Sequence, residues 1–250
     1  MKTLLAIIIT ATFSFGCAML EGEQTTTDSG GGGTTSAPTG GGDSTPTVSA
    51  DSAVTSGRIA AGDGHTCAIK ADDSVECWGS DVYGQSTTPV GLGSVKSITT
   101  GAYHTCAIKS DDSVECWGRD THAQTNIPVG LGSVKSVAAG GNHTCAIKAD
   151  DNVQCWGGGG GFGQSSVPSG LGNVKSINAG KWHTCVIKAD DSVQCWGADW
   201  DGESTVPSGL SSVKSVAGGD GHTCAIKADD SLQCWGSDTN GESTVPADFQ

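Results

Sequence analysis

Histidine and cysteine, two residue types suited to metal binding and catalysis, recur in this sequence at a fixed spacing. The pattern His-Thr-Cys-(Ala/Val)-Ile-Lys, followed by Cys-Trp-Gly, occurs five times, and its histidines are His65, His104, His143, His183 and His222. Five equivalent histidines around an axis could hold a metal ion, but no second ligand type recurs beside them. We therefore favour a structural role, in which each His-Thr pair satisfies backbone groups between neighbouring units.

The ten cysteines of these copies form pairs ten residues apart, a spacing unlike the C-x-x-C spacing of zinc sites. In the first copy, two short strands over residues 67–70 and 74–78 flank a turn at 71–73. A three-residue turn places Cys67 opposite Cys77 on one sheet face, at a separation that a disulfide tolerates. We predict one bridge within each copy: Cys67–Cys77, Cys106–Cys116, Cys145–Cys155, Cys185–Cys195 and Cys224–Cys234.

Other patterns that could do chemistry are incomplete. The paired aspartates at each turn, such as Asp72 and Asp73, lack the spacing of a calcium loop and are explained by turn propensity. The G-x-G-x-x-G at residues 158–163 has no strand and helix around it, so we interpret it as an expanded loop. No nucleophile elbow or zinc-protease motif occurs. We predict no catalytic residue, no metal and no cofactor, and consider a hydrolase the least favoured function.

The N-terminus predicts export. Residues 1–3 form a short charged region, residues 4–15 form a short apolar run, and small residues precede Cys17, as in a secretory signal peptide spanning residues 1–16. The segment Ser14-Phe15-Gly16-Cys17 resembles the lipobox of bacterial lipoproteins, which implies lipid attachment at Cys17. The alternative is cleavage alone, with a free thiol at Cys17. Residues 17–57, rich in Thr, Ser, Gly and Pro, are expected to be a flexible linker, and residues 58–250 a single repeat domain.

The charge of the chain excludes several classes of partner. There are 13 Lys and Arg against 27 Asp and Glu, which gives a net charge of −14. Nucleic acids and anionic lipid surfaces are bound through clustered cations, so neither is an expected partner. Membrane contact is expected only through the N-terminal lipid, in the cell envelope at the outer membrane or cell surface. Without the lipid, the protein would be secreted.

The five copies are spaced by 39, 39, 40 and 39 residues, a period typical of stacked supersecondary units. Three short strands per repeat, with turn residues between them, predict an all-β array. The motif Gly-x-x-His-Thr-x-Ala, followed by Asp-x-x-Val-x-x-Trp-Gly, resembles the repeat of the regulator of chromosome condensation family. The resemblance implies a β-propeller, either a closed five-bladed ring or an incomplete propeller, because that family usually has seven blades. The family's nucleotide-exchange activity is not expected here, and secreted β-lactamase inhibitory proteins of the propeller type are a closer functional comparison.

Two windows vary between the repeats: the pair of residues before each motif histidine, and the residues after each Trp-Gly. Large aromatic and cationic side chains gather there, as in binding hot spots. The candidate partner-binding residues are Tyr83, Tyr103, Arg119, His122, Phe162, Lys181, Trp182 and Trp200. We expect Tyr103, Trp182 and Trp200 to converge on one side. The sequence thus predicts an exported, lipid-anchored module that binds a protein or a glycan, with a structural envelope protein as the alternative.

Overall fold

The computed structural model describes residues 57–159 and 161–250. The predicted signal peptide, Cys17 and the linker up to residue 56 lie outside the described residues. Within the described ranges, no helix has the length and apolar character needed to cross a membrane.

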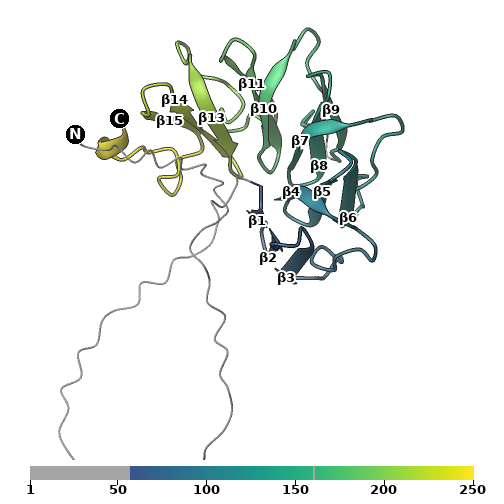
Figure 1. The fold of residues 1–250 in the computed structure, drawn as a ribbon. Coiled ribbons are helices and arrows are strands. Elements are labelled where there is room, and N and C mark those ends of the chain that lie inside the picture. The colour runs from purple at the N-terminus through teal and green to yellow at the C-terminus, as the bar shows by residue number, and fades with distance from the viewer. Residues whose placement is uncertain (1–56, 160) are drawn as a thin grey trace, which may run out of the picture. The chain divides into compact units, whose positions relative to one another are not determined.

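The described chain folds into five three-stranded antiparallel sheets, one for each repeat, which follow one another from the first to the last (Figure 1). This arrangement confirms the all-β array. The strands of the first three sheets are β1 (Ile59–Ala61), β2 (His65–Ile69), β3 (Val75–Gly79), β4 (Val95–Thr100), β5 (His104–Lys109), β6 (Val114–Gly118), β7 (Val134–Ala139), β8 (His143–Lys148) and β9 (Val153–Gly157). The last two sheets contain β10 (Val174–Ala179), β11 (His183–Lys188), β12 (Val193–Gly197), β13 (Val213–Gly218), β14 (His222–Lys227) and β15 (Leu232–Gly236), and a short 3-10 helix η1 (Ala247–Phe249) follows.

The hairpin between the second and third strands of each sheet has the predicted register. In the first sheet Cys67 pairs with Cys77 and Ile69 with Val75. The turn is three residues long, and Asp73 closes it with φ of 63°, in the left-handed region that Asp tolerates better than most residues. The carboxylate of Asp72 accepts hydrogen bonds from the backbone N–H of Ser74 at 3.1 Å and from its hydroxyl at 2.6 Å. The two aspartates therefore stabilise the turn in different ways.

All five predicted disulfides are present, each linking cysteines ten residues apart within one repeat. Their Cα atoms are 4.0–4.1 Å apart, slightly closer than the 4.5–5.5 Å typical of opposed residues in antiparallel strands. Bridges at this density are typical of proteins that fold in an oxidising compartment.

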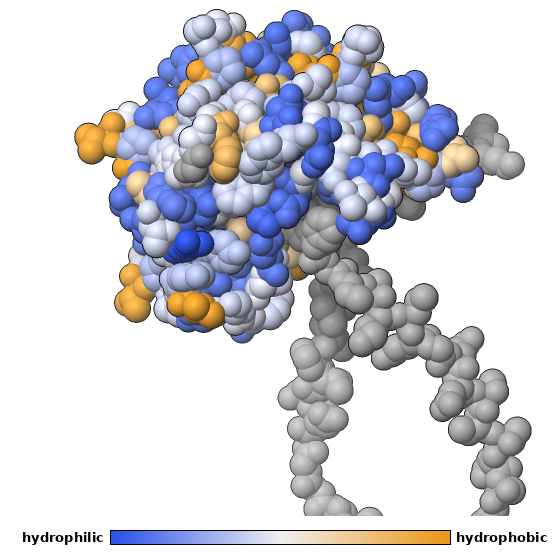
Figure 2. Space-filling view, turned by 180° about the vertical axis from the view of Figure 1, so that it is seen from behind, coloured by the Kyte–Doolittle hydropathy of each residue, from blue (hydrophilic) through white to orange (hydrophobic). Residues whose placement is uncertain are grey.

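The hydrophobic core lies between successive sheets. Between the first two sheets, Cys67 and Ile69 pack against Val95, Ile98 and Trp117 of the next sheet, and the same contact recurs at the three following junctions. The motif tryptophans of the second to fifth repeats are buried there, with 7–8% of their surface exposed. Seen from behind in Figure 2, hydrophobic residues form only small separate patches on a largely hydrophilic surface.

The described array is not closed. The inner strands β1, β4, β7, β10 and β13 pack in this order, each against the next. Within residues 57–159 and 161–250, no comparable packing joins β13 back to β1. Of the two architectures expected from the sequence, the described chain therefore fits the incomplete propeller.

Candidate functional site

The first four motif histidines each contact the next repeat rather than a common centre. The Nε2 atom of His65 lies 2.9 Å from the hydroxyl of Thr105, and that hydroxyl donates to the carbonyl of Gln85 at 2.9 Å. Since the threonine proton is used in this way, the histidine Nε2–H is the donor to Thr105. The same contact is described for His104 with Thr144, His143 with Thr184, and His183 with Thr223.

Burial keeps these histidines neutral. Removal from water lowers the pKa of His104 and His143 to about 3 and that of His183 to about 4. Among the described residues, no group of three or more His, Cys, Asp or Glu side chains could hold a metal ion. The histidines thus join one sheet to the next.

Glycines allow the sheets to approach closely at the same end of the strands. A Cβ atom on Gly62 would lie 2.3 Å from the carbonyl oxygen of Gly101 and 2.7 Å from the ring of His65, so only glycine fits. Backbone hydrogen bonds then link the segments before successive histidines, including Lys181 N–H to the carbonyl of Gly219 at 3.0 Å. The first variable window of each repeat is therefore held beside its neighbours.

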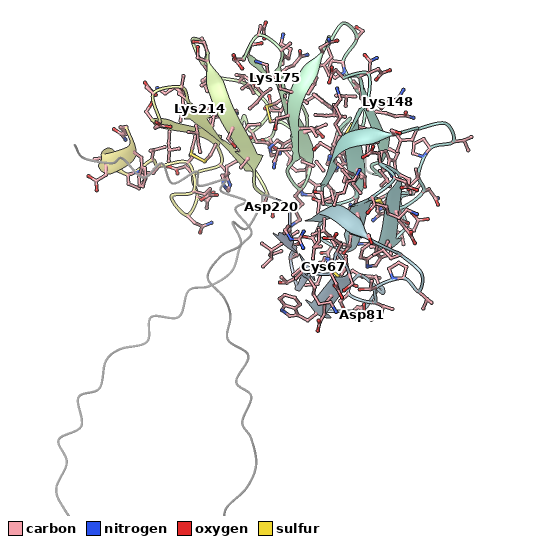
Figure 3. The ribbon with its side chains drawn as sticks, in the orientation of Figure 1. Cys67, Asp81, Lys148, Lys175, Lys214 and Asp220 are labelled. Carbon is pink, nitrogen blue, oxygen red and sulfur yellow. A yellow bond between two sulfur atoms is a disulfide. The ribbon has the colours of Figure 1, made fainter. Side chains whose placement is uncertain are left out.

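The second variable window is attached to the first by backbone pairing. Ser80 N–H donates to the carbonyl of Gly64 at 2.7 Å, and Arg119 N–H donates to that of Tyr103 at 2.9 Å. We call the surface formed by both windows the loop face; it comprises residues 62–64, 80–84, 101–103, 119–123, 140–142, 158–159, 161–163, 180–182, 198–202, 219–221 and 237–241. Figure 3 shows Asp220 of the loop face beyond one end of β13, with Lys214 toward the other end.

Polar side chains fix the conformation of the second window. The carboxylate of Asp81 accepts hydrogen bonds from the N–H groups of Ser86 at 2.8 Å and Thr87 at 3.0 Å, and the hydroxyl of Thr87 also donates to it. These bonds lower the pKa of Asp81 below its ordinary value. Gln85 is buried, and its side-chain oxygen accepts from Tyr83 N–H at 2.8 Å. These positioning residues are not among the candidates expected from the sequence, although Gln/Glu recurs at the Gln85 position in every repeat.

One aromatic cluster joins the first two repeats. The rings of Tyr83 and Tyr103 meet edge to face with centroids 5.6 Å apart. The guanidinium of Arg119 lies 5.1 Å from the centroid of the Tyr83 ring and 5.2 Å from that of Tyr103, within the range of a cation–π interaction. We call Tyr83, Tyr103 and Arg119 the tyrosine cluster.

A second cluster joins the third and fourth repeats. The ring of Phe162 lies 5.6 Å from that of Trp182 and 4.8 Å from that of Trp200, and the two tryptophans are 6.4 Å apart, all edge to face. Trp200 is 62% exposed, so this group, which we call the tryptophan cluster, presents a large aromatic surface to solvent.

The remaining two candidates lie on the same face. The backbone of the Gly-rich loop approaches His122 so closely that a Cβ on Gly159 would lie 2.3 Å from its Nδ1. The ammonium of Lys181 is 2.8 Å from the carboxylate of Asp220. That hydrogen bond raises the pKa of Lys181, and the charges of Asp220, Asp63 and Tyr103 act in the same direction. Groups from three other repeats therefore act on one ammonium.

The structure thus places all eight candidates on the loop face but divides most of them between two clusters. Trp182 and Trp200 are in contact, whereas Tyr103 packs with Tyr83 and Arg119 instead. All three share a face because equivalent positions of successive repeats lie at the same edge of the array. Their division arises because edge-to-face contact needs rings from the same or adjacent repeats.

Repeated three-stranded blades packed through their inner strands define a scaffold of the β-propeller class. The chain belongs to the regulator of chromosome condensation (RCC1) repeat family. The matched residues are 58–85, 95–124, 134–164, 174–202 and 213–242.

Solved structures agree with this assignment. The ectodomain of the receptor kinase CR4 from Physcomitrella patens is 30% identical, with 72% of this chain and 50% of that chain covered and a TM-score of 0.60. The ectodomain of the receptor kinase ACR4 from Arabidopsis thaliana is 29% identical, with 71% and 64% covered and a TM-score of 0.61. Prp20p from Saccharomyces cerevisiae shares the fold at 18% identity, with 76% and 59% covered and a TM-score of 0.64.

This chain spans only about half to two thirds of the length of these solved chains. A comparison with curated protein sequences finds no match.

Proposed function

We propose that this protein is an exported, lipid-anchored surface module that binds a protein or a glycan through the loop face. Lipid attachment at Cys17 would hold it at the outer membrane or the cell surface. The five disulfides support an extracellular location, because such bridges persist in oxidising compartments.

The observation that carries the proposal is the exposure of aromatic rings on loops that are otherwise small and polar. Trp200 is 62% exposed and Tyr83 44%, and each is held by neighbouring rings. Rigid aromatic side chains bury a large area on binding at a small cost in side-chain entropy, and Arg119 adds a cation of the kind enriched at hot spots. A scaffold that served stability alone would gain nothing from leaving these rings in water.

Two features favour a protein ligand over a glycan. The tyrosine and tryptophan clusters come from different pairs of repeats, which suits a ligand that covers several blades. Prp20p, which shares the fold, binds Gsp1p and histones, so a propeller of this kind can bind proteins. A glycan remains the second candidate, since exposed tryptophans also stack on sugar rings.

The test compares two triple variants of the full chain. In one, Tyr103, Trp182 and Trp200 are replaced by Ala; in the other, Lys135, Lys175 and Lys214, which form exposed ion pairs with turn aspartates, are replaced by Ala. A partner captured from envelope extract by the wild type is then titrated against all three proteins. We expect the aromatic variant to bind at least about 30-fold more weakly, equivalent to about 2 kcal/mol, and the lysine variant to bind as the wild type does.

The outcomes separate binding from folding. Thermal unfolding of the aromatic variant should match that of the wild type, because the buried motif tryptophans and the disulfides remain. Equal affinity of the aromatic variant for the partner would contradict the proposal. Loss of folding in that variant would show that the clusters are packing elements and would also contradict it.

A further inference from the structure

The two ends of the array carry unequal faces. In the three middle sheets, the central strands β5, β8 and β11 are buried on both faces from the histidine to the isoleucine. In β2, by contrast, Cys67 and Ile69 are buried but Thr66 and Ala68 are half-buried. In β14 the alternation is reversed, since Thr223 is buried and Cys224 is half-buried. Each terminal sheet thus has one face with a neighbour and one face with less cover.

In the first sheet, the less covered face is the one that packs against the preceding sheet in every later repeat. Trp78 and Ile59 are each 51% exposed. Their counterparts in the four later repeats face the preceding sheet and are only 3–9% exposed. We call the face of the first sheet that contains Ile59, Ala68 and Trp78 the front flank.

The fifth sheet presents the complementary side. Cys224 and Ile226 are half-buried, although the corresponding cysteines and isoleucines of the first four repeats are 0–7% exposed beneath the next sheet. Glu242 occupies the position of Gln85 and is likewise half-buried, whereas its four counterparts are 0–2% exposed. We call the face with Cys224, Ile226 and Glu242 the rear flank.

The chemistry of the junction is known from its four occurrences within the chain. At each one the motif tryptophan donates its indole N–H to the backbone carbonyl of the Gln or Glu in the preceding repeat. The described pairs are Trp117 with Gln85, Trp156 with Gln124, Trp196 with Gln164, and Trp235 with Glu203, at 2.9–3.1 Å. Trp78 is the fifth such donor, and Glu242 carries the fifth such carbonyl.

We propose that the front flank of one copy of this chain packs on the rear flank of a second copy, head to tail. In this contact Trp78 donates to the backbone carbonyl of Glu242 in the other copy and Ile59 lies against the other copy's Ile226. A second copy is the occupant because it carries the same repeat and therefore the matching side of a junction that the fold already makes four times. Such a heterologous contact leaves one free flank at each end, so it forms rings or chains of copies.

The test uses the full chain with Cys17→Ser, which removes the one cysteine outside the five bridges and so prevents disulfide-linked dimers. Sedimentation velocity over a wide concentration range should show association of this protein. Adding Trp78→Arg should weaken the association at least about 10-fold. The matched control is Val90→Arg, which changes a fully exposed apolar residue outside both flanks and should leave association unchanged.

Mixing distinguishes a head-to-tail contact from any symmetric one. A chain with Trp78→Arg keeps its rear flank, and a chain with Ile226→Arg keeps its front flank. Each should be monomeric alone, and an equimolar mixture should form a 1:1 complex through the single intact junction. If Ile226→Arg fails to fold by circular dichroism, Glu242→Pro, which reshapes the backbone at the acceptor carbonyl, takes its place.

Three results would overturn the proposal: a monomer at every concentration, association that survives Trp78→Arg, or a mixture that stays monomeric. None of these results bears on the loop face, so the proposed binding function is tested separately.

Discussion

Lowering the pH from 7.5 to 5 should destabilise the folded domain strongly, because its buried histidines resist protonation. Burial lowers the pKa of His104 and His143 to about 3 and that of His183 to about 4, whereas an unfolded chain protonates histidine near pH 6.5. Below about pH 6.5 the unfolded state therefore binds protons that the folded state does not. The stability that these neutral histidines contribute is complete above that pH and is lost as the pH falls toward 3 to 4.

The size of the effect follows from the distance between the two pKa values. Each histidine lowers the free energy of unfolding by about 1.4 kcal/mol per pH unit below its unfolded pKa, hence by about 2 kcal/mol at pH 5. The three together lower it by about 6 kcal/mol. Burial also lowers the pKa of His65, which adds a loss of the same sign. A domain is typically stable by about 5–15 kcal/mol, so this loss is a large part of the total.

Carboxylates add little to this loss in the same range. Hydrogen bonds from Ser74 and Thr87 lower the pKa of Asp72 and Asp81. Their contribution to stability is complete above the unfolded pKa of about 3.9 and is lost only at lower pH. Between pH 7.5 and 5, the histidines alone should set the slope.

The assay is guanidinium unfolding with the disulfides intact, monitored by far-UV circular dichroism at four pH values from 7.5 to 5. It measures the slope of the free energy of unfolding against pH. His143→Gln keeps an N–H donor for Thr184 but does not titrate, so its slope should be smaller than that of the wild type by about one proton, or about 1.4 kcal/mol per pH unit. Lys135→Gln removes an exposed cation and should keep the wild-type slope. A free energy of unfolding that stays constant from pH 7.5 to 5, or a wild-type slope in His143→Gln, would refute the reasoning.

Three further predictions concern the scaffold and the anchor. Gly140→Ala should cost about 3 kcal/mol or more of the free energy of unfolding, because its Cβ would lie 2.2 Å from a histidine ring carbon, while Gly221→Ala, with no atom nearer than 3.5 Å, should be close to wild type. Replacing Cys145 and Cys155 together by Ala should cost about 2.5–3 kcal/mol in the same denaturation assay. Cys17→Ala should move the protein from the membrane fraction to the soluble fraction, and unchanged membrane association would exclude a lipid at this cysteine.

The features that depend on one repeat were predictable from the sequence. The register that pairs Cys67 with Cys77 follows from the odd number of turn residues, and the left-handed turn position follows from the tolerance of Asp73 for that conformation. It was also predictable that the variable windows lie on one face, because equivalent positions of successive repeats share an edge of the array. Each of these conclusions needs only the local chain and its period.

The features that depend on the packing of neighbouring repeats were not predictable. Nothing local indicates that the carbonyl of Gln85 accepts both the hydroxyl of Thr105 and the indole N–H of Trp117. The separation of Tyr103 from Trp182 likewise depends on which rings come within contact distance once the sheets have packed. These outcomes depend on the angle and spacing between sheets, which the repeat length alone does not determine.

Trp78 illustrates the limit of inference from a motif most directly. Its local sequence matches that of Trp117, since both follow Val-Glu-Cys and precede Gly, yet the first is 51% exposed and the second 8%. The difference arises only because Trp117 has a preceding sheet against which to pack. In a repeat array, position in the series therefore determines the environment of a residue as strongly as its type does. For the same reason the scaffold residues of inner repeats are committed to their neighbours. The two surfaces proposed for recognition, the variable windows of the loop face and the flanks of the terminal sheets, are the parts of the repeat that this packing leaves free.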